Sequence, residues 1–299
     1  MTRAVIITNP AAGRSAPADL TVARRRLAER GLAVDVVRTA ARGDAARLAR
    51  EAMDDGADLL IAHGGDGTVM EVAGSLVGTG RPLGLLPAGT GNLLAGNLGI
   101  RRAAGAAMDV ILAGATRAVD VGSVESSAGV RYFAVAAGVG FDAQLMHQTA
   151  QHHKRAFGVG AYVATAIRLA TTITRATVRI EMDATTYEGK AAIVLVANCR
   201  DLITGGVFQL GPGIELDDGL LDVAVLDAET LAGAARIAWR LFTRRPHADP
   251  GITFFKARTI RIETDPVLPA QADGEADGHS PLTIEVRPRA LVVFAPPRG

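Results

Sequence analysis

The stretch Leu59-Leu-Ile-Ala-His-Gly-Gly-Asp-Gly-Thr68 decides how this chain folds. Its first four residues, Leu59–Ala62, have the length and character of a buried strand, and a glycine-rich turn follows at once. Apolar residues then recur at helical spacing between Val69 and Val77, which predicts a helix. A strand that passes through a short turn into a helix is the building unit of parallel α/β sheets.

The same alternation runs through the first 120 residues. Strands are predicted at Ala4–Thr8, Val34–Val37, Leu59–Ala62 and Leu83–Leu86. The first predicted helix is capped by Ser15, continues through Leu27 and ends at Gly31. Further helices are predicted at Asp44–Met53, after Thr68, after Asn92 and at Ala103–Leu112. Strand–helix alternation at this spacing predicts a parallel sheet with helices on both faces.

The pattern changes near Asp120, where strands follow one another with few helices between them. Strands are predicted at Val119–Val124, Tyr132–Ala136, Thr177–Met182, Ala191–Ala197, Leu221–Leu226, Thr259–Glu263, Leu282–Val286 and Leu291–Phe294, helices at Phe157–Thr171 and Leu231–Phe242, and a polar loop at Asp265–Ser280. The second helix places Leu231, Ala235, Ala238 and Phe242 on one face and Arg236, Arg240 and Arg244 towards another. This pattern is typical of an antiparallel sandwich or barrel.

Composition narrows the class of protein. A length of 299 residues predicts two domains, and a net charge of +1 argues against a nucleic-acid binder that relies on bulk charge. The single cysteine excludes an internal disulfide and a cysteine metal cluster, which favours a reducing cytoplasm. The longest uncharged apolar stretch, Ala156–Ile167, is shorter than the ~20 residues that span a bilayer, so we expect a soluble protein.

Three glycine-rich turns follow predicted strands: Asn9-Pro-Ala-Ala-Gly13, Gly64-Gly-Asp-Gly-Thr68 and Pro87-Ala-Gly-Thr-Gly-Asn92. In a parallel sheet they emerge at one edge, where glycine permits close approach and helix N-termini offer N–H groups to anions. This arrangement predicts a polyphosphate site; the alternative is ordinary strand-to-helix turns. The P-loop pattern is absent, because Gly189-Lys190 is followed by alanine.

Three groups of acidic residues could each have either a functional or an ordinary structural role. Asp66, inside a phosphate-binding turn, needs a cation such as magnesium between its carboxylate and the phosphates, or else it caps the following helix, a role that Thr68 could also take. The cluster Gly213-Ile-Glu-Leu-Asp-Asp-Gly-Leu-Leu-Asp222 is either a cation site or a solvated hairpin turn. Glu275, in Gln271-Ala-Asp-Gly-Glu275, is either a placed base or part of a solvated loop.

Taken in order, the motifs resemble the bacterial soluble diacylglycerol kinases and the sphingosine kinase-like lipid kinases over nearly the whole chain. The elements are Asn9-Pro-x-x-Gly13, Gly64-Gly-Asp-Gly-Thr68, Pro87-x-Gly-Thr-x-Asn92, Asp120-Val-Gly122, Gly138-x-Gly-Phe-Asp-Ala143, Asp217-Asp-Gly-x-Leu-Asp222 and Gln271-x-Asp-Gly-Glu275. NAD kinases and phosphofructokinases share the second element, so the order of all seven carries the resemblance.

The resemblance implies an NAD-kinase-like α/β domain of residues 1–122 with a returning strand at about 289–299, and a β-sandwich lipid-substrate domain of residues 123–288. It implies ATP contacts at Asn9, Pro10, Gly13, Thr39, Gly64, Gly65, Asp66, Gly67, Thr68, Glu71, Gly89, Thr90 and Asn92. It implies that Glu275, or alternatively Asp66, accepts the proton of the substrate, and that Asp66 and Asp120 lie near magnesium. It also implies a structural Mg²⁺ at Glu215, Asp218 and the carbonyl of Leu220.

The implied activity is ATP-dependent phosphorylation of a lipid hydroxyl, on a diacylglycerol, a sphingoid base or a related lipid. A lipid acceptor requires transient docking at the inner face of the membrane, which we expect near Phe157–Tyr162, and the basic stretch His152–Arg155 could meet anionic head groups or simply be solvated. A homodimer is compatible with the resemblance. The alternatives are a kinase for a soluble acceptor such as NAD or a sugar, and a nucleotide-gated lipid-binding protein without turnover.

Overall fold

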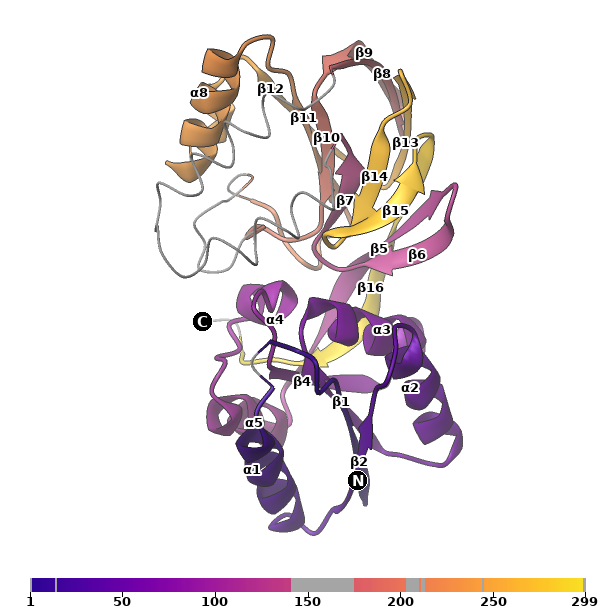
Figure 1. Cartoon of the computed structure of the whole chain (residues 1–299), viewed down its shortest axis with the longest axis vertical. Coiled ribbons are helices and arrows are strands. Elements are labelled where there is room, and N and C mark those ends of the chain that lie inside the picture. The colour runs from indigo at the N-terminus through magenta and orange to yellow at the C-terminus, as the bar shows by residue number, and fades with distance from the viewer. Residues whose placement is uncertain are drawn as a thin grey trace. The chain divides into compact units, whose positions relative to one another are not determined.

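The computed structural model describes residues 2–13, 15–140, 175–202, 210, 213–243 and 245–297 (Figure 1). The predicted helix Phe157–Thr171, the basic stretch His152–Arg155 and the docking residues near Phe157–Tyr162 lie outside the described residues, as does the end of the Gly138–Ala143 motif. The chain divides into two compact units. Met1–Val121 and Pro288–Gly299 form the first, and Gly122–Arg287 form the second.

The first unit is built on a parallel sheet with the strand order β2-β1-β3-β4-β16. The strands are β1 (Arg3–Thr8), β2 (Ala33–Arg38), β3 (Leu59–Gly64), β4 (Pro82–Pro87) and the C-terminal part of β16 (Leu282–Phe294). All residues of β3 are buried, as expected for a strand covered on both faces. The four strands predicted for this region are confirmed.

Helices cover both faces of this sheet (Figure 1). They are α1 (Pro17–Ala28), α2 (Asp44–Asp54), α3 (Asp66–Leu76), α4 (Leu93–Asn97) and α5 (Ala104–Ala113). Helix α1 packs beside α5, and α2 packs beside α3. The predicted cap at Ser15 is wrong: the N-cap of α1 is Ala16, which makes no side-chain bond, and Pro17 in the first turn has no N–H group that would need an acceptor.

The second unit is a sandwich of two antiparallel sheets. One sheet has the order β12-β11-β10-β7-β14-β15, with β12 (Ile252–Ala257), β11 (Leu221–Leu226), β10 (Ile193–Ala197), β7 (Ala136–Val139), β14 (Pro269–Ala272) and β15 (Glu275–His279). The other contains β16, β13 (Thr259–Asp265), β8 (Ala176–Met182) and β9 (Thr185–Ala191), together with β5 (Thr116–Ser126) and β6 (Gly129–Phe133). Buried residues of both sheets, such as Ile180 and Val194, share one core.

Several predicted boundaries in the second half are wrong. The loop predicted at Asp265–Ser280 is the hairpin β14–β15, whose polar side chains conceal its extended backbone. The two strands predicted at Leu282–Val286 and Leu291–Phe294 are one strand, β16, which pairs with β13 and then in parallel with β4. Bends split the predicted strands Tyr132–Ala136 and Ala191–Ala197, and strands β9 and β12 were not predicted.

Helix α8 (Leu231–Phe242) begins and ends at the predicted residues. Its buried side is the stripe Gly233, Ile237 and Leu241, which lies between the two predicted faces. Within the described part of the chain, no helix is both long enough and apolar enough to cross a membrane.

Candidate functional site

Three glycine-rich turns leave the same edge of the parallel sheet. The ends of the strands are paired neighbours: Thr8 of β1 pairs with His63 of β3, and Gly64 of β3 pairs with Pro87 of β4. The turns that follow β1, β3 and β4 therefore start side by side at carboxyl ends of strands. This is the edge at which open α/β sheets bind ligands.

The second and third turns pack backbone against backbone. A Cβ atom placed on Gly89 would lie 2.3 Å from the Cα atom of Gly65, and one placed on Gly64 would lie 2.7 Å from the Thr68 side chain. No side chain fits at these distances. The glycines are therefore needed because the chain segments approach one another, a requirement in addition to the close approach of a ligand that the sequence predicted.

Asp66 joins these two turns. It is the first residue of α3, and its carboxylate accepts the N–H groups of Asn92 at 2.7 Å and of Leu93 at 2.5 Å, at the start of α4. Burial raises the pKa of the Asp66 carboxyl, and the hydrogen bonds from Leu93 and Asn92 oppose that shift. Asp66 is thus a helix cap, but it caps α4 rather than the helix that follows it.

Asn92 and Arg102 complete the third turn. Asn92 has a positive φ of 55°, and its side chain accepts the N–H of Gly89 at 2.9 Å and donates to the carbonyl of Gly89 at 2.8 Å. The Arg102 guanidinium donates to the carbonyls of Thr90 and Gly91. Arg102 was not predicted from the sequence, because no motif marks an arginine that lies ten residues beyond the turn it holds.

The first turn is tied to the other two. The Asn9 amide donates to Thr68 Oγ1 at 3.1 Å and accepts the N–H of Ala11 at 2.9 Å, and a Cβ atom on Gly13 would lie 3.4 Å from Thr90 Oγ1. Pro10 is exposed in this turn. The three turns of the first unit therefore form one connected set of backbone segments.

Of two further predicted nucleotide contacts, Thr39 lies on the β2–α2 connection, and Glu71 lies on α3 and bonds to that connection. The Thr39 N–H donates to the Thr8 carbonyl at 2.9 Å, which continues the pairing of β1 with β2. The Glu71 carboxylate on α3 accepts the N–H groups of Gly43 at 2.9 Å and of Ala45 at 3.0 Å. Glu71 therefore caps α2 and holds this connection in place.

Asp120 lies on β5 and is completely buried. Its Oδ1 accepts the N–H of Arg289 at 2.7 Å, where β16 has a positive φ of 49°. The carboxylates of Asp66 and Asp120 both accept backbone N–H groups, and each carboxylate has further lone pairs. Their role near magnesium stays a prediction.

The acidic segment 213–222 surrounds an ammonium group. Lys256 Nζ on β12 lies 2.9 Å from the carbonyl of Gly213, 3.0 Å from Asp218 Oδ2 and 3.4 Å from Asp222 Oδ2. The other oxygen of Asp218 accepts the N–H of Leu220 at 3.0 Å. These oxygen atoms are of the kind that magnesium prefers, but the lysine already occupies the point where they converge.

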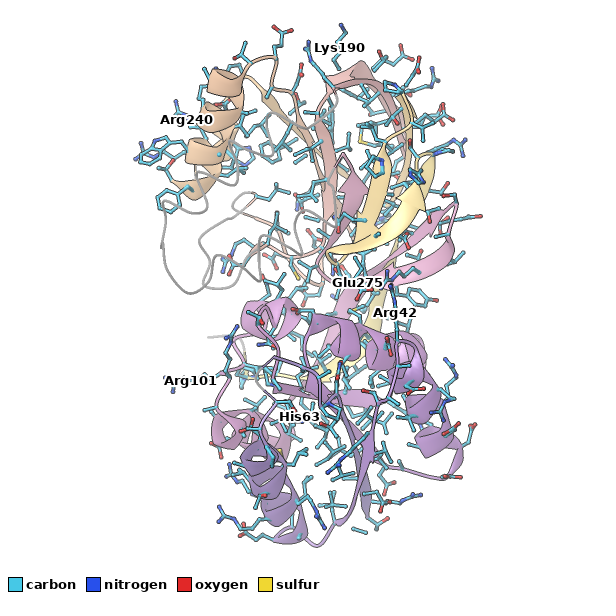
Figure 2. The ribbon with its side chains drawn as sticks, viewed as in Figure 1. Arg42, His63, Arg101, Lys190, Arg240 and Glu275 are labelled. Atoms are coloured by element: carbon cyan, nitrogen blue, oxygen red, sulfur yellow. The ribbon has the colours of Figure 1, made fainter. Side chains whose placement is uncertain are left out.

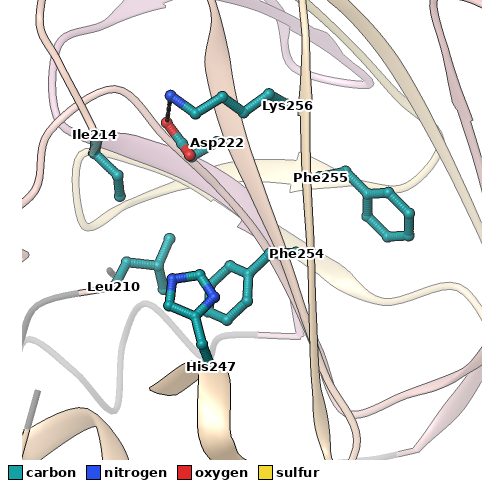
Figure 3. Close-up of a pocket in the computed structure, with 7 residues that line it drawn as sticks. All are labelled: Leu210, Ile214, Asp222, His247, Phe254, Phe255 and Lys256. Carbon is teal, nitrogen blue, oxygen red and sulfur yellow. Dashed lines mark ion pairs between the residues drawn. The ribbon is translucent and has the colours of Figure 1, made fainter. Parts of the chain in front are cut away.

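A pocket of about 240 Å³ adjoins this ammonium (Figure 3). Its lining residues are Leu210, Ile214, Asp222, His247, Phe254, Phe255 and Lys256. The His247 ring packs against Phe254 with a centroid distance of 4.3 Å. Burial raises the pKa of the Asp222 carboxyl to about 6, although Lys256 opposes the shift. Among the described residues, no group of three or more His, Cys, Asp or Glu side chains is arranged to hold a metal.

Replacing Lys256 with methionine tests which cation stabilises the acidic segment. We expect EDTA and Mg²⁺ to leave the melting temperature of the wild-type protein unchanged, because the ammonium neutralises Asp218 and Asp222. We expect K256M to lower the free energy of unfolding by about 1–2 kcal/mol and to make it respond to Mg²⁺. Lys190→Met, at an exposed position on β9, is the control (Figure 2). A wild-type protein that EDTA destabilises would restore the metal at Glu215, Asp218 and Leu220.

Glu275 begins β15, in the hairpin that the sequence predicted as a loop (Figure 2). Its carboxylate pairs with the guanidinium of Arg131 on β6, and the other amino group of Arg131 lies 3.9 Å from Asp277. Both Glu275 and Arg131 are about one-quarter exposed. The carboxylate is therefore oriented by a partner on a strand of the other sheet, which argues against a freely solvated loop residue.

The same hairpin is anchored by Asp273. This residue has a positive φ of 49°, and its carboxylate accepts the N–H groups of Ala134 and Val135 at 2.9 Å and of Ala136 at 3.1 Å. The sequence singled out the motif but not this role. Three consecutive amides donated to one aspartate fix the turn that presents Glu275.

His63 provides a titratable group beneath the second turn. It is fully buried, its Nδ1 lies 2.8 Å from Thr8 Oγ1, and its Nε2 lies 3.8 Å from the Asp19 carboxylate. Burial lowers the pKa of the imidazole below 6.5, and Asp19 opposes that shift. The folded protein therefore favours the neutral ring.

This shift makes stability depend on pH. Below pH 6.5 the unfolded chain binds a proton at this position more readily than the folded chain, so the free energy of unfolding should fall as the pH drops through 6.5. Denaturant titrations at several pH values, with the wild-type protein and with His63→Gln, measure the effect. The variant should have a shallower dependence in this range, and an identical slope for both proteins would contradict the assignment.

Comparison with known proteins covers nearly the entire chain. Residues 3–124 match the family model of the diacylglycerol kinase catalytic domain, and residues 134–295 match that of the YegS C-terminal NAD kinase beta sandwich-like domain. The diacylglycerol kinase of Bacillus subtilis (strain 168) is 31% identical over 285 residues, which are 94% of this chain and 92% of that protein. The diacylglycerol kinase of Staphylococcus aureus (strain Newman) is 31% identical over 298 residues, 98% of this chain and 92% of that protein.

Two further proteins extend the comparison. An uncharacterized protein of Synechocystis is 32% identical over 247 residues, 81% of this chain, and the chain spans 56% of its length. A crystal structure of a diacylglycerol kinase from Bacillus anthracis str. Sterne has a TM-score of 0.74 and 26% identity, and the match covers 99% of this chain and 97% of that one.

Proposed function

Because this chain belongs to the bacterial diacylglycerol kinase family, we propose that it is an ATP-dependent lipid kinase that transfers the γ-phosphoryl group of ATP to a lipid hydroxyl. The kinases of this family use ATP. The acceptor we propose is a diacylglycerol, a sphingoid base or a related lipid. The first unit binds the nucleotide, and the second supplies the lipid-binding part of the protein.

The connected turns of the first unit carry this proposal. Phosphoryl transfer depends on neutralising the charge of the γ-phosphate and on positioning the attacking oxygen. The N-terminus of α3 and the glycine turns beside it offer backbone N–H groups for phosphate oxygens. The bonds from Asp66, Asn92 and Asn9 hold these amides in place before the nucleotide arrives, so less conformational freedom is lost on binding.

The other two requirements of the reaction are a cation on the phosphates of ATP and a base for the lipid hydroxyl. Magnesium enters with ATP as the MgATP complex, where it reduces the negative charge of the phosphates. Glu275 accepts the proton of the lipid hydroxyl as that oxygen attacks the γ-phosphorus, and ADP leaves. We place the protein in the cytoplasm, with transient binding to the inner face of the membrane, because a lipid acceptor lies in a bilayer.

A single assay separates this function from its rivals. The protein is incubated with γ-labelled ATP, Mg²⁺ and one acceptor at a time: diacylglycerol, a sphingoid base, ceramide, phosphatidylglycerol, NAD or a sugar. We expect label in the organic phase with at least one lipid. Label in NAD or the sugar alone would replace the proposal with a kinase for a soluble acceptor. ATP binding without any labelled product would indicate a nucleotide-gated binding protein.

A further inference from the structure

The hairpin β14–β15, which carries Glu275, is attached at both of its ends to the β5–β6 hairpin and the residues that follow it. At one end, the Asp273 carboxylate accepts three backbone N–H groups, those of Ala134–Ala136. At the other end, Ser127 Oγ accepts the N–H of His279 at 3.1 Å. In the sequence, β6 lies between these two points of attachment. The position of Glu275 is therefore fixed relative to β6.

The second attachment requires a glycine. A Cβ atom on Gly278, whose φ is 72°, would lie 2.4 Å from Ser127 Oγ and 3.0 Å from the amide nitrogen of Ala128. A side chain at this position would force the two segments apart. The turn of the β5–β6 hairpin consequently lies directly against β15, and this contact sets the position of β6 along that strand (Figure 1).

Arg131, in the middle of β6, bridges two carboxylates of β15. One amino group of its guanidinium pairs with Glu275 Oε2, and the other lies 3.9 Å from Asp277 Oδ1. Residues two apart on a strand point to the same face, so one guanidinium can reach both carboxylates. Asp277 is buried, whereas Glu275 is about one-quarter exposed. The guanidinium thus lies between a buried carboxylate and the partly exposed carboxylate of Glu275.

We propose that Arg131 and Asp277 are positioning residues for the proton transfer that Glu275 performs. They have this task only if the protein is the proposed kinase, so the inference rests on that function. A general base works when it is held within hydrogen-bond reach of the proton that it accepts, and a further group commonly orients it. A guanidinium suits this task, because its planar fork can donate to two carboxylates at once.

The alternative is that the ion pair only fastens β6 to β15. Partly exposed ion pairs contribute little to stability, and this hairpin is already attached through Asp273 and at Gly278. A fastening role therefore predicts that removing the guanidinium changes turnover little. A positioning role predicts a loss of turnover that depends on the presence of the Glu275 carboxylate.

Substitution of Arg131 tests the proposal in the full-length protein, with γ-labelled ATP and the lipid acceptor. We expect Arg131→Met to lower kcat at least about tenfold, because a displaced base loses much of its contribution. The KM for ATP should stay near its wild-type value, since Arg131 belongs to the second unit and ATP binding is proposed for the first. Arg131→Lys keeps the charge without the fork, so its kcat should lie between those of R131M and the wild type.

A matched control and a second variant accompany this substitution. Arg261→Met removes an arginine that pairs with Glu263 at 2.8 Å on β13 of the same unit, and it should leave kcat unchanged. Asp277→Asn removes the second partner of the guanidinium, so it should lower kcat in the same direction as R131M but by a smaller factor. An Asp277→Asn variant with wild-type kcat would remove Asp277 from the proposal.

A double-mutant cycle separates positioning from a general structural defect. In Glu275→Gln the base is already absent, so adding Arg131→Met should lower kcat by less than about twofold further. A structural defect would instead lower kcat by the same factor in both backgrounds. Equal factors, or wild-type kcat in R131M, would overturn the proposal. Circular dichroism shows whether R131M folds, and Arg131→Lys completes the same cycle if it does not.

The wild-type protein in the same assay distinguishes this proposal from the kinase proposal. Turnover of at least one lipid by the wild type, with unchanged turnover in R131M, would reject the positioning role and leave the kinase in place. Absence of turnover by the wild type with every lipid and every soluble acceptor would reject the kinase, and the role of Arg131 and Asp277 with it.

Discussion

Glu275→Gln is expected to lower kcat at least ~100-fold while ATP binding stays near its wild-type strength, because a general base contributes ~10²–10⁴-fold to turnover. Glutamine keeps an oxygen that can accept the bond from Arg131, so the β14–β15 hairpin should retain its structure. The lost property is the ability to take up the proton of the lipid hydroxyl. Initial rates at saturating ATP, together with nucleotide binding by calorimetry, separate the two effects.

Glu263→Gln is the matched control. Glu263 lies on β13 of the same unit and is paired with Arg261 at 2.8 Å, so this change also removes the charge of a glutamate from a partly exposed ion pair with arginine. It should leave kcat unchanged. Near-normal turnover of E275Q would remove Glu275 from the mechanism, and an equal loss in both variants would point to a general effect of charge.

Asp66→Asn is expected to weaken ATP binding at least about tenfold and to lower the free energy of unfolding by about 1–3 kcal/mol. The carboxylate accepts two amides of the α4 N-terminus, whereas an asparagine offers one oxygen and turns an NH₂ group towards the second amide. Removing a buried charge relieves some desolvation, but it cannot replace the lost acceptor. Calorimetry with MgATP and denaturant titration measure both quantities.

Asp54→Asn is its control, because Asp54 is exposed at the end of α2. That substitution should change neither ATP affinity nor stability measurably. If D66N bound MgATP as tightly as the wild-type protein, the link between the second and third turns would not be required for nucleotide binding. A stable D66N variant with normal ATP binding but no turnover would instead favour a direct chemical role for Asp66.

The strands of the first unit could be predicted because parallel strands buried on both faces are nearly continuous apolar runs. Leu59–Ala62 and Leu83–Leu86 differ from the observed strands by one or two residues at their ends. The bounds of helix α8 were predicted to the residue, but the predicted apolar face is not its buried side. By contrast, β9 has an exposed or half-exposed residue at every position except the last, so its sequence resembles that of a loop.

The hairpin β14–β15 was missed for a related reason. In this hairpin the side chains of Gln271 and Asp273 accept backbone N–H groups, from Gly274 and from Ala134–Ala136 respectively, and Asp277 lies 3.9 Å from the Arg131 guanidinium. Polar side chains normally predict a solvent-exposed segment, whereas these side chains accept hydrogen bonds within the protein. Strand β12 contains two aromatic residues, Phe254 and Phe255, which favour a strand, although no strand was predicted there.

The candidate site was predictable to the level of the turns but not of their internal bonds. The positions of the glycines follow from the motif and from the strand ends. The bonds from Asp66 to Asn92 and Leu93 span 26 and 27 residues of sequence, and no local pattern reports such a pair. The same holds for Lys256, which reaches Asp218 from 38 residues away.

The long strand β16 determines where the chain can be divided into fragments. Its first part pairs with β13 and its last part with β4, so the first unit is assembled from two separate pieces of sequence. A fragment that stopped at Val121 would leave the edge of β4 open, and open edges promote aggregation. Supplying residues 282–297 as a synthetic peptide should close that edge, so a binding signal could report on reassembly of the two pieces.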